Sequence, residues 1–286
     1  MILFKKLNNI VGWTIFLIAS LVYLSTIEQT VSFWDCGEYI ATAYKLEVGH
    51  PPGAPLFQLF GRIFSLFATP GTSEVAIAIN TLSALCSSFT ILFLFWTITA
   101  FSKKIIIKNQ NINIEQTILI LSSGVVGSLA YTFSDSFWFS AVEGEVYAMS
   151  SLFTAATFWC IMKWEEESHK PSSGRWLVLI AYLIGLSIGV HLLSLLTIPA
   201  MGMIYYFKKY QYTKSGAIKA FFVSIGLLGL VQGVIIPGAV SLISKFELFF
   251  VNSIGLPFNS GAIIYLIAII CAVSYTHLTL PTTDRV

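Results

Sequence analysis

The sequence predicts an all-α, polytopic membrane helical bundle of about eight spans, with a long first outward loop that bears short helices. Three observations support this prediction. Hydrophobic residues make up 56% of the 286 residues and charged residues only 10%, against about 25% charged residues in soluble domains. The mean hydropathy is +0.80, so the chain has too few polar side chains to cover a water-facing surface. Apolar runs long enough to approach the width of a bilayer recur along the chain.

These runs define the expected spans. We predict them at Ile10–Thr26, Val75–Phe101, Thr117–Phe133, Ala141–Met162, Trp176–Val190, Leu192–Phe207, Ala217–Ser241 and Gly261–Ala272. The fifth and sixth runs share one apolar stretch, which forms either a tight helical hairpin or a single broken helix. The first run follows two lysines, but no small-residue cleavage site comes after it, so we expect an anchor and not a signal peptide.

The positive charges predict the orientation of these spans. With the N-terminus in the cytoplasm, twelve Lys and Arg residues fall on the cytoplasmic side. Only three fall on the other side, namely Lys45, Arg62 and Lys245. Because cytoplasmic loops are enriched in Lys and Arg, this bias predicts that Glu28–Glu74, Ser134–Ser140 and Lys245–Ser260 face outward.

The low charge, the scattered cysteines and the lack of ligand-binding motifs argue against several classes of protein. The net charge is only +2 and no basic stripe occurs, which argues against a nucleic-acid partner. The four cysteines are far apart in the sequence and match neither a disulfide framework nor a metal site. The acids and histidines are not at metal-ligand spacing, and no nucleotide-binding glycine motif occurs. We therefore expect no metal and no cofactor.

The C-terminal residues differ from the rest of the chain. From Val273 the text VSYTHLTLPTT stops being membrane-like and resembles the translated read-through of a sequencing adapter. We therefore expect residues 1–272 to be a truncated N-terminal transmembrane domain, and residues 273–286 to be an artefact rather than natural protein.

The first outward loop holds an unusual share of the polar residues. Helical spacing predicts one short helix at Cys36–Leu46 and a second at Leu56–Phe67, separated by a proline-rich turn that begins at His50. Asp35 is placed as the N-cap of the first helix, and Glu38 could complete a capping box. Arg62 could be an interfacial snorkelling residue. Long loops of this kind are usually functional, so a structural role for each residue competes with a role in a site.

Further polar side chains are expected at the same membrane face. Glu143 and Glu145 open the fourth span, where acids are costly unless they face a wet cavity or a partner. His191 lies at the outward tip of the fifth and sixth spans, where it is either a turn residue or part of a site. All these groups are compatible with one polar cavity that opens outward.

Three segments carry a resemblance to a known family. The run Trp34–Ala43 (WDCGEYIATA) and the run Gly49–Phe57 (GHPPGAPLF) resemble the signature of a large, mainly bacterial family of membrane proteins. Its animal relative is transmembrane protein 260, a protein O-mannosyltransferase. The run Phe139–Ala148 (FSAVEGEVYA) is similar to the same family, and the likeness covers essentially all of residues 1–272. The family is in turn similar to the GT-C glycosyltransferases.

This resemblance implies a function and a location. It implies transfer of a mannose-like sugar from a polyprenyl-phosphate donor to a hydroxyl of an acceptor protein or glycan, at the outer face of a bacterial inner membrane. The resemblance also makes Asp35 the candidate general base and Glu38 a second catalytic candidate, which positions either Asp35 or the acceptor. The candidate substrate-binding residues are His50, Arg62, Glu145 and His191, with Arg62 assigned to the leaving phosphate.

Two other classes of function remain open at this point. A secondary transporter would also place polar residues near broken helices, but here the charges cluster at one face and the spans show no repeated halves. A non-enzymatic assembly subunit of the membrane would leave the loop acids without a task.

Overall fold

The computed structural model describes residues 2–107 and 112–279, and every regular element within these ranges is helical. This confirms the all-α prediction. The chain divides into two compact units, Met1–Thr197 and Ile198–Val286, which are described separately below.

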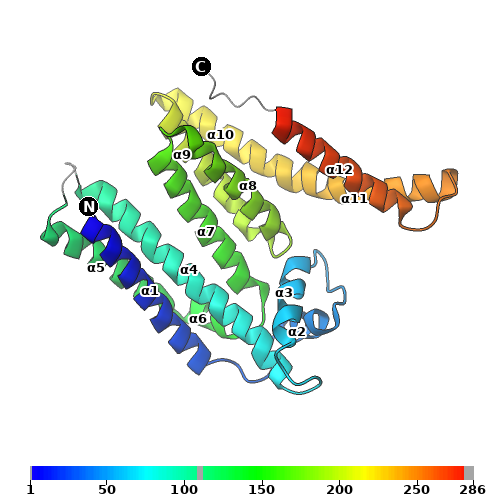
Figure 1. Ribbon diagram of the computed structural model, residues 1–286, viewed down its shortest axis with the longest axis horizontal. Helices are drawn as coiled ribbons and strands as arrows, with labels where there is room; N and C mark the ends of the chain where they lie inside the picture. Colours follow the sequence, from blue (N-terminus) through cyan, green and yellow to red (C-terminus); the bar gives the residue numbers. More distant parts are fainter. Residues whose placement is uncertain (1, 108–111, 280–286) are drawn as a thin grey trace. The chain divides into compact units, whose positions relative to one another are not determined.

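Long helices form the frame of the first unit (Figure 1). The 33-residue helix α4 (Glu74–Ile106) lies at the centre, and α1 (Ile2–Ser25), α5 (Ile114–Thr132) and α7 (Val146–Glu167) each pack against it. No proline interrupts α4, and its length of about 50 Å exceeds the thickness of a bilayer core. Buried apolar residues hold α1, α4 and the short helix α6 (Asp135–Val142) together.

Two short helices stand beside the N-terminal end of α4, as the sequence predicts. Helix α2 (Cys36–Lys45) ends where Leu46 adopts a left-handed conformation, and α3 (Pro55–Ser65) begins with a proline, which suits a first helical position. Gly61 allows close approach here, because a Cβ at this position would lie 2.8 Å from Cβ of Ala43. The remaining elements of this unit are η1 (Pro171–Ser173), α8 (Gly174–Ile188) and η2 (Leu192–Leu196).

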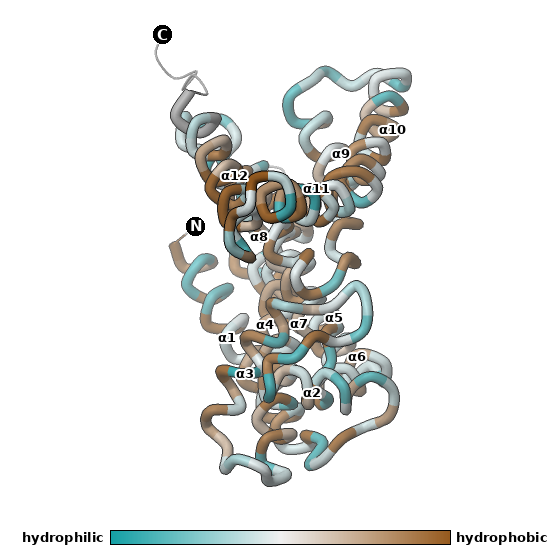
Figure 2. The backbone as a smooth tube through the Cα atoms, turned by 90° about the vertical axis from the view of Figure 1, so that its right-hand side faces the viewer, coloured by the Kyte–Doolittle hydropathy of each residue, from teal (hydrophilic) through white to brown (hydrophobic). Residues whose placement is uncertain are grey.

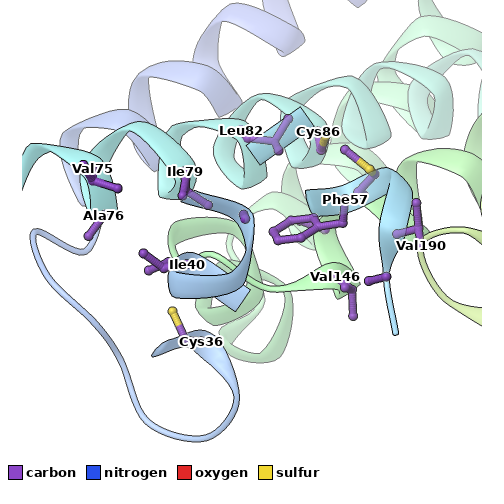
Figure 3. Packing of buried hydrophobic residues seen from close by; sticks show 14 residues of the cluster. Cys36, Ile40, Phe57, Val75, Ala76, Ile79, Leu82, Cys86, Val146 and Val190 are labelled. Carbon is purple, nitrogen blue, oxygen red and sulfur yellow. The ribbon is translucent and has the colours of Figure 1, made fainter. Parts of the chain in front are cut away.

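A hydrophobic core joins α2 and α3 to the bundle (Figure 3). Phe57 of α3 is fully buried and lies between Ile79 of α4 and Val146 at the start of α7. Ile40 of α2 packs into the same cluster. These contacts fix the segment between α1 and α4 against two long helices, so this segment is an ordered part of the fold.

The second unit is largely one long interrupted helix and its neighbours. It contains α9 (Thr197–Lys209), α10 (Lys214–Leu230), α11 (Ile236–Leu248) and α12 (Ser260–Thr279), with the π-helical segments η3 (Val231–Ile235) and η4 (Phe249–Ser253) after α10 and α11. The Tyr265 hydroxyl donates a hydrogen bond to the Ala239 carbonyl and ties α12 to α11. Figure 2 shows that α11 and α12 are predominantly hydrophobic, as expected for helices in lipid.

Five helices within the described ranges are long and apolar enough to cross a membrane. They are Ile2–Ser25, Glu74–Ile106, Ile114–Thr132, Pro171–Ile188 and the continuous Lys214–Ser253. The apolar helix Ser260–Tyr275 is shorter. The chain is therefore a membrane protein with a helical bundle, although fewer helices meet both criteria than the eight spans expected.

Three boundaries differ from the sequence prediction. The fourth expected span begins too early, because residues 143–145 are extended and separate α6 from α7. Lys245 lies within α11 and not in a loop. The sixth expected span begins with the 3-10 helix η2 at Leu192–Leu196, and α-helix starts only at Thr197.

The structure describes only part of the expected artefact at residues 273–286. Helix α12 continues from Ser260 through Thr279, past the expected boundary after Ala272. Residues 280–286 lie outside the described residues. The division at residue 272 therefore stays a prediction.

Candidate active site

Asp35 occupies the N-cap position of α2, as predicted, but its carboxylate does not cap the helix. The side chain makes no hydrogen bond to the first helical amides, and Glu38 does not reach back to the cap. The predicted capping box is therefore wrong. The carboxylate of Asp35 instead stays exposed to the outside of the fold, where it can take part in other interactions.

Glu38 is occupied by the proline-rich turn. Its carboxylate accepts a 2.6 Å hydrogen bond from the backbone amide of His50 and lies 3.0 Å from Nδ1 of the same residue. The opposite ring nitrogen, Nε2, lies 3.9 Å from the Asp35 carboxylate. The imidazole thus stands between two acids.

These contacts shift both titrations in the directions expected for an ion pair. Hydrogen bonds from the backbone and ring of His50 lower the pKa of Glu38. The hydrogen bond to Glu38, together with the charges of Glu38 and Asp35, raises the pKa of His50. His50 is therefore cationic over a wider pH range than an isolated histidine.

The same three side chains lie close enough to hold an ion. One ligand atom from each of Asp35, Glu38 and His50 lies within 4.8 Å of the others, although the residues are far from ligand spacing in the sequence. All three are exposed, and the Glu38–His50 ion pair already accounts for much of the arrangement. The expected absence of a metal stays a prediction.

Glu145 lies in the extended segment between α6 and α7 and is only 5% exposed. Burial raises the pKa of its carboxyl to about 7, and the charges of Glu143 and Asp35 add to this increase. The backbone of Asp35 forms a hydrogen bond with the Glu145 carboxyl, which opposes the increase. The contact joins the segment before α7 to the start of α2.

The segment that carries Glu145 is held by α4 and by the chain after α1. The Asn80 amide of α4 donates hydrogen bonds to the carbonyls of Glu28 and Thr30, at 2.8 and 3.2 Å. A Cβ on Gly144 would lie 2.8 Å from Oδ1 of Asn80, so glycine permits the close approach. Ser32 donates a hydrogen bond to the buried Glu143 carboxylate. These contacts hold the segment that carries Glu145 next to the start of α2.

Tyr39 lies near both Asp35 and Glu145, and sequence reasoning missed it. Its ring centroid lies 5.8 Å from that of His50 and 5.6 Å from that of Phe57. Burial raises the pKa of Tyr39 to about 12, with further increases from the charges of Asp35 and Glu145. Its place one residue after Glu38 was the only signal available in the sequence.

Trp34 is a second residue that the analysis of the sequence left without a role. Its side chain is 89% exposed although it directly precedes Asp35. Its φ angle of 66° lies in the left-handed region, which costs a bulky residue roughly 1–3 kcal/mol. A strained backbone and an open indole therefore stand beside the candidate base.

The other two predicted site residues have different surroundings. Nδ1 of His191 accepts a 3.1 Å hydrogen bond from the Leu193 amide and caps η2, while its ring lies 5.5 Å from that of Tyr147. Burial lowers the pKa of His191. Tyr147 is two residues after Glu145, so His191 lies next to the cluster of Asp35, Glu38, His50 and Glu145.

The structure places Arg62 away from the cluster. Its Nη1 donates a 2.9 Å hydrogen bond to the Tyr44 carbonyl, and its guanidinium lies 5.3 Å from the Tyr44 ring. Tyr44 is nine residues beyond Asp35 along the same helix, a rise of about 14 Å. Arg62 therefore binds the far end of α2, and its role in substrate binding stays a prediction.

Comparisons with known proteins give the family. A family model described as the protein O-mannosyl-transferase TMEM260 N-terminal domain matches residues 35–214, more than half of the chain. The chain is 28% identical over 195 residues to protein O-mannosyl-transferase tmem260 of Dictyostelium discoideum, covering 65% of this chain and 22% of that protein. It is 25% identical over 175 residues to protein O-mannosyl-transferase TMEM260 of Mus musculus, covering 61% and 22%.

The chain thus spans about a fifth of the length of these curated relatives. No solved structure matches the chain. The family match begins at Asp35 and includes α2, α3, the segment at Glu145 and His191. The chain belongs to the family of the TMEM260 N-terminal domain.

Proposed function

We propose that the chain is the membrane part of a GT-C-type glycosyltransferase. It moves a mannose-like sugar from a polyprenyl phosphate to a hydroxyl of an acceptor protein or glycan at the outer face of the membrane. The names of the relatives support sugar transfer to protein. The observation that carries the proposal is the exposed carboxylate of Asp35, which makes no capping hydrogen bond and lies near the buried carboxyl of Glu145.

Asp35 has the properties that a general base needs. Its carboxylate makes no capping hydrogen bond, and it is exposed at the start of α2, where an acceptor hydroxyl can approach it. As the acceptor oxygen attacks the anomeric carbon, its proton passes to Asp35. The bond between the anomeric carbon and the phosphate oxygen breaks, and the phosphate leaves on the polyprenyl carrier. Such a base contributes about 10²–10⁴-fold to the rate.

The leaving phosphate needs a positive group near this base. His50 is within reach of the carboxylate of Asp35, and its ion pair with Glu38 favours the imidazolium. We therefore assign the phosphate to His50 and give Arg62 the task of fixing α2 to α3. This changes the assignment that the sequence favours, because Arg62 binds Tyr44, and about 14 Å of helix separates Tyr44 from Asp35.

Glu145 and Trp34 complete the proposed site. A carboxyl with a pKa of about 7 is partly protonated at neutral pH, so Asp35 does not face a fully charged neighbour. The exposed indole of Trp34 offers an apolar face against which a sugar ring can stack. His191, which borders Tyr147, is left to bind the acceptor side.

The test uses the full-length protein and a matched pair of variants. Asp35→Asn keeps the size of the side chain but cannot accept the proton, and it should lose about 10²–10⁴-fold in transfer from a polyprenyl-phosphate mannose. Asp135→Asn is the control, since Asp135 is also an exposed acid at the start of a helix. Near-parental turnover by a well-folded Asp35→Asn variant would remove Asp35 from the mechanism.

A further inference from the structure

A cavity of about 740 Å³ lies between α1, α4 and α7, at the end of α4 far from Asp35. Helix α4 packs against both α1 and α7, and the cavity opens between these two neighbours. Its volume lies in the range of small-molecule sites. None of the groups proposed for sugar transfer lines it.

The inner wall of this cavity is aromatic. Three tryptophans contribute, one from each helix: Trp13, Trp96 and Trp159. The ring centroid of Trp96 lies 6.2 Å from that of Trp13 and 5.7 Å from that of Trp159. Such a surface is apolar and rigid, and it suits the upper part of a lipid chain.

The rim of the cavity carries an excess of positive charge. Four lysines line it, Lys5, Lys103, Lys104 and Lys163, against the two glutamates Glu165 and Glu166. Glu166 is shared between Lys103 and Lys163, at 3.6 and 3.2 Å, and Glu165 pairs with Lys104. Lys5 has no ion-pair partner among the residues that the structure describes. The protein's own acids therefore do not neutralise this rim.

Two lining residues also have incomplete hydrogen bonding. In the described part of the chain, the indole nitrogen of Trp96 and Oδ1 of Asn8 are buried and have no hydrogen-bond partner. Most buried polar atoms in folded proteins are paired, but a Cβ on Gly12 would lie 2.7 Å from the indole nitrogen of Trp96, so this nitrogen faces the packed contact with α1 and not the cavity.

We propose that this cavity binds one anionic membrane phospholipid, with its phosphate on the lysine rim and the start of its chains against the three tryptophans. Lysines and tryptophans are common at membrane interfaces without any bound molecule. A cavity of this volume whose lining holds four lysines against two glutamates goes beyond that general tendency. The inference is independent of the proposed sugar transfer.

Native mass spectrometry of the full-length protein with added phosphatidylglycerol tests this proposal. The parent should retain one lipid molecule, and Lys5→Gln should weaken its binding about tenfold or more. Lys5 is the preferred variant because no ion pair of the fold depends on it. Lys170→Gln is the control, since it removes the same charge outside the cavity and should leave binding unchanged.

Three additions distinguish the ligand. Neutral phosphatidylcholine and inorganic phosphate should not compete with phosphatidylglycerol, and a polyprenyl phosphate should compete poorly. Stronger binding of the polyprenyl phosphate, displacement by inorganic phosphate, or an equal loss in Lys170→Gln would overturn the proposal. A Trp13→Leu variant checks the apolar wall, because it keeps every charge and should also weaken retention of the lipid.

Discussion

The two ends of α4 carry polar groups of opposite charge, delivered by different kinds of structure. Ile79 packs near the acidic end and Lys103 stands at the basic end, about 36 Å apart along the helix, which is close to the thickness of a bilayer. At the acidic end, Asp35, His50 and Glu145 come from the N-cap, a turn and an extended segment. At the basic end, the lysines project from the helices themselves.

This difference teaches how each end obtains its properties. Groups on irregular segments must be held by specific contacts, such as those from Glu38 to His50 and from Asn80 to Glu28. Groups on helices are placed by the helical register, and at the basic end ion pairs such as that of Lys103 with Glu166 add to this. The fixed positions at the acidic end suit the sugar transfer that we propose, and the lysines at the basic end suit the proposed lipid.

The largest expected effect distinguishes His50 from Arg62 as the group that binds the donor phosphate. His50→Gln should raise the KM for the polyprenyl-phosphate donor by roughly 10- to 100-fold, because it removes a charge-assisted contact with phosphate. Arg62→Gln should leave this KM near the parental value. It should instead lower stability by roughly 1–3 kcal/mol through loss of the bond to the Tyr44 carbonyl.

Steady-state kinetics with varied donor, together with chemical unfolding, measure both quantities. A large increase in donor KM for Arg62→Gln, with His50→Gln unaffected, would return the phosphate to Arg62. The proposed site would then have to extend to the far end of α2.

A second effect concerns the pH dependence of stability. Because the pKa of Glu145 is raised to about 7 in the folded protein, the folded state binds the proton more tightly than the unfolded state. Its contribution to stability is present below pH 4.5 and is lost as the pH rises to about 7. Thermal unfolding should therefore give a lower Tm at pH 8 than at pH 5, and Glu145→Gln should flatten this slope.

Glu143 acts in the same direction, since burial also raises its pKa, so a residual slope should remain in the variant. A parental slope that Glu145→Gln leaves unchanged would mean that Glu145 is fully ionised in the fold. The carboxylates of Asp35 and Glu145 would then both be charged at the acidic end.

The smallest effect compares two helix caps, one at each end. Asn113 accepts a hydrogen bond from the Gln116 amide and forms a complete capping box at the start of α5. Asn113→Ala should therefore cost about 1 kcal/mol of stability. Asp35→Ala should cost clearly less, because Asp35 makes no capping hydrogen bond. Equal losses in chemical unfolding would show that Asp35 is a structural cap.

The sequence predicted those parts of the site that depend on local pattern. The bounds of α2 and α3 agree within about two residues, because prolines and helical spacing act locally. The capping box was wrong because Glu38 has a better partner twelve residues away in His50, across a turn. The burial of Glu145 and the place of Arg62 depend on packing between distant segments, which spacing along one chain does not encode.

The location of the two ends relative to the membrane tests the central claim most directly, because the proposed donor approaches Asp35 from outside. In a Cys271→Ser background, the three remaining cysteines are buried, and one cysteine is added at Val48 or at Glu115. Val48 is 95% exposed at the acidic end, and Glu115 is exposed at the start of α5, at the basic end. An impermeant maleimide should label Val48→Cys in intact cells, and Glu115→Cys only after permeabilisation. Labelling of Glu115→Cys in intact cells, with Val48→Cys protected, would contradict an outward-facing site of sugar transfer.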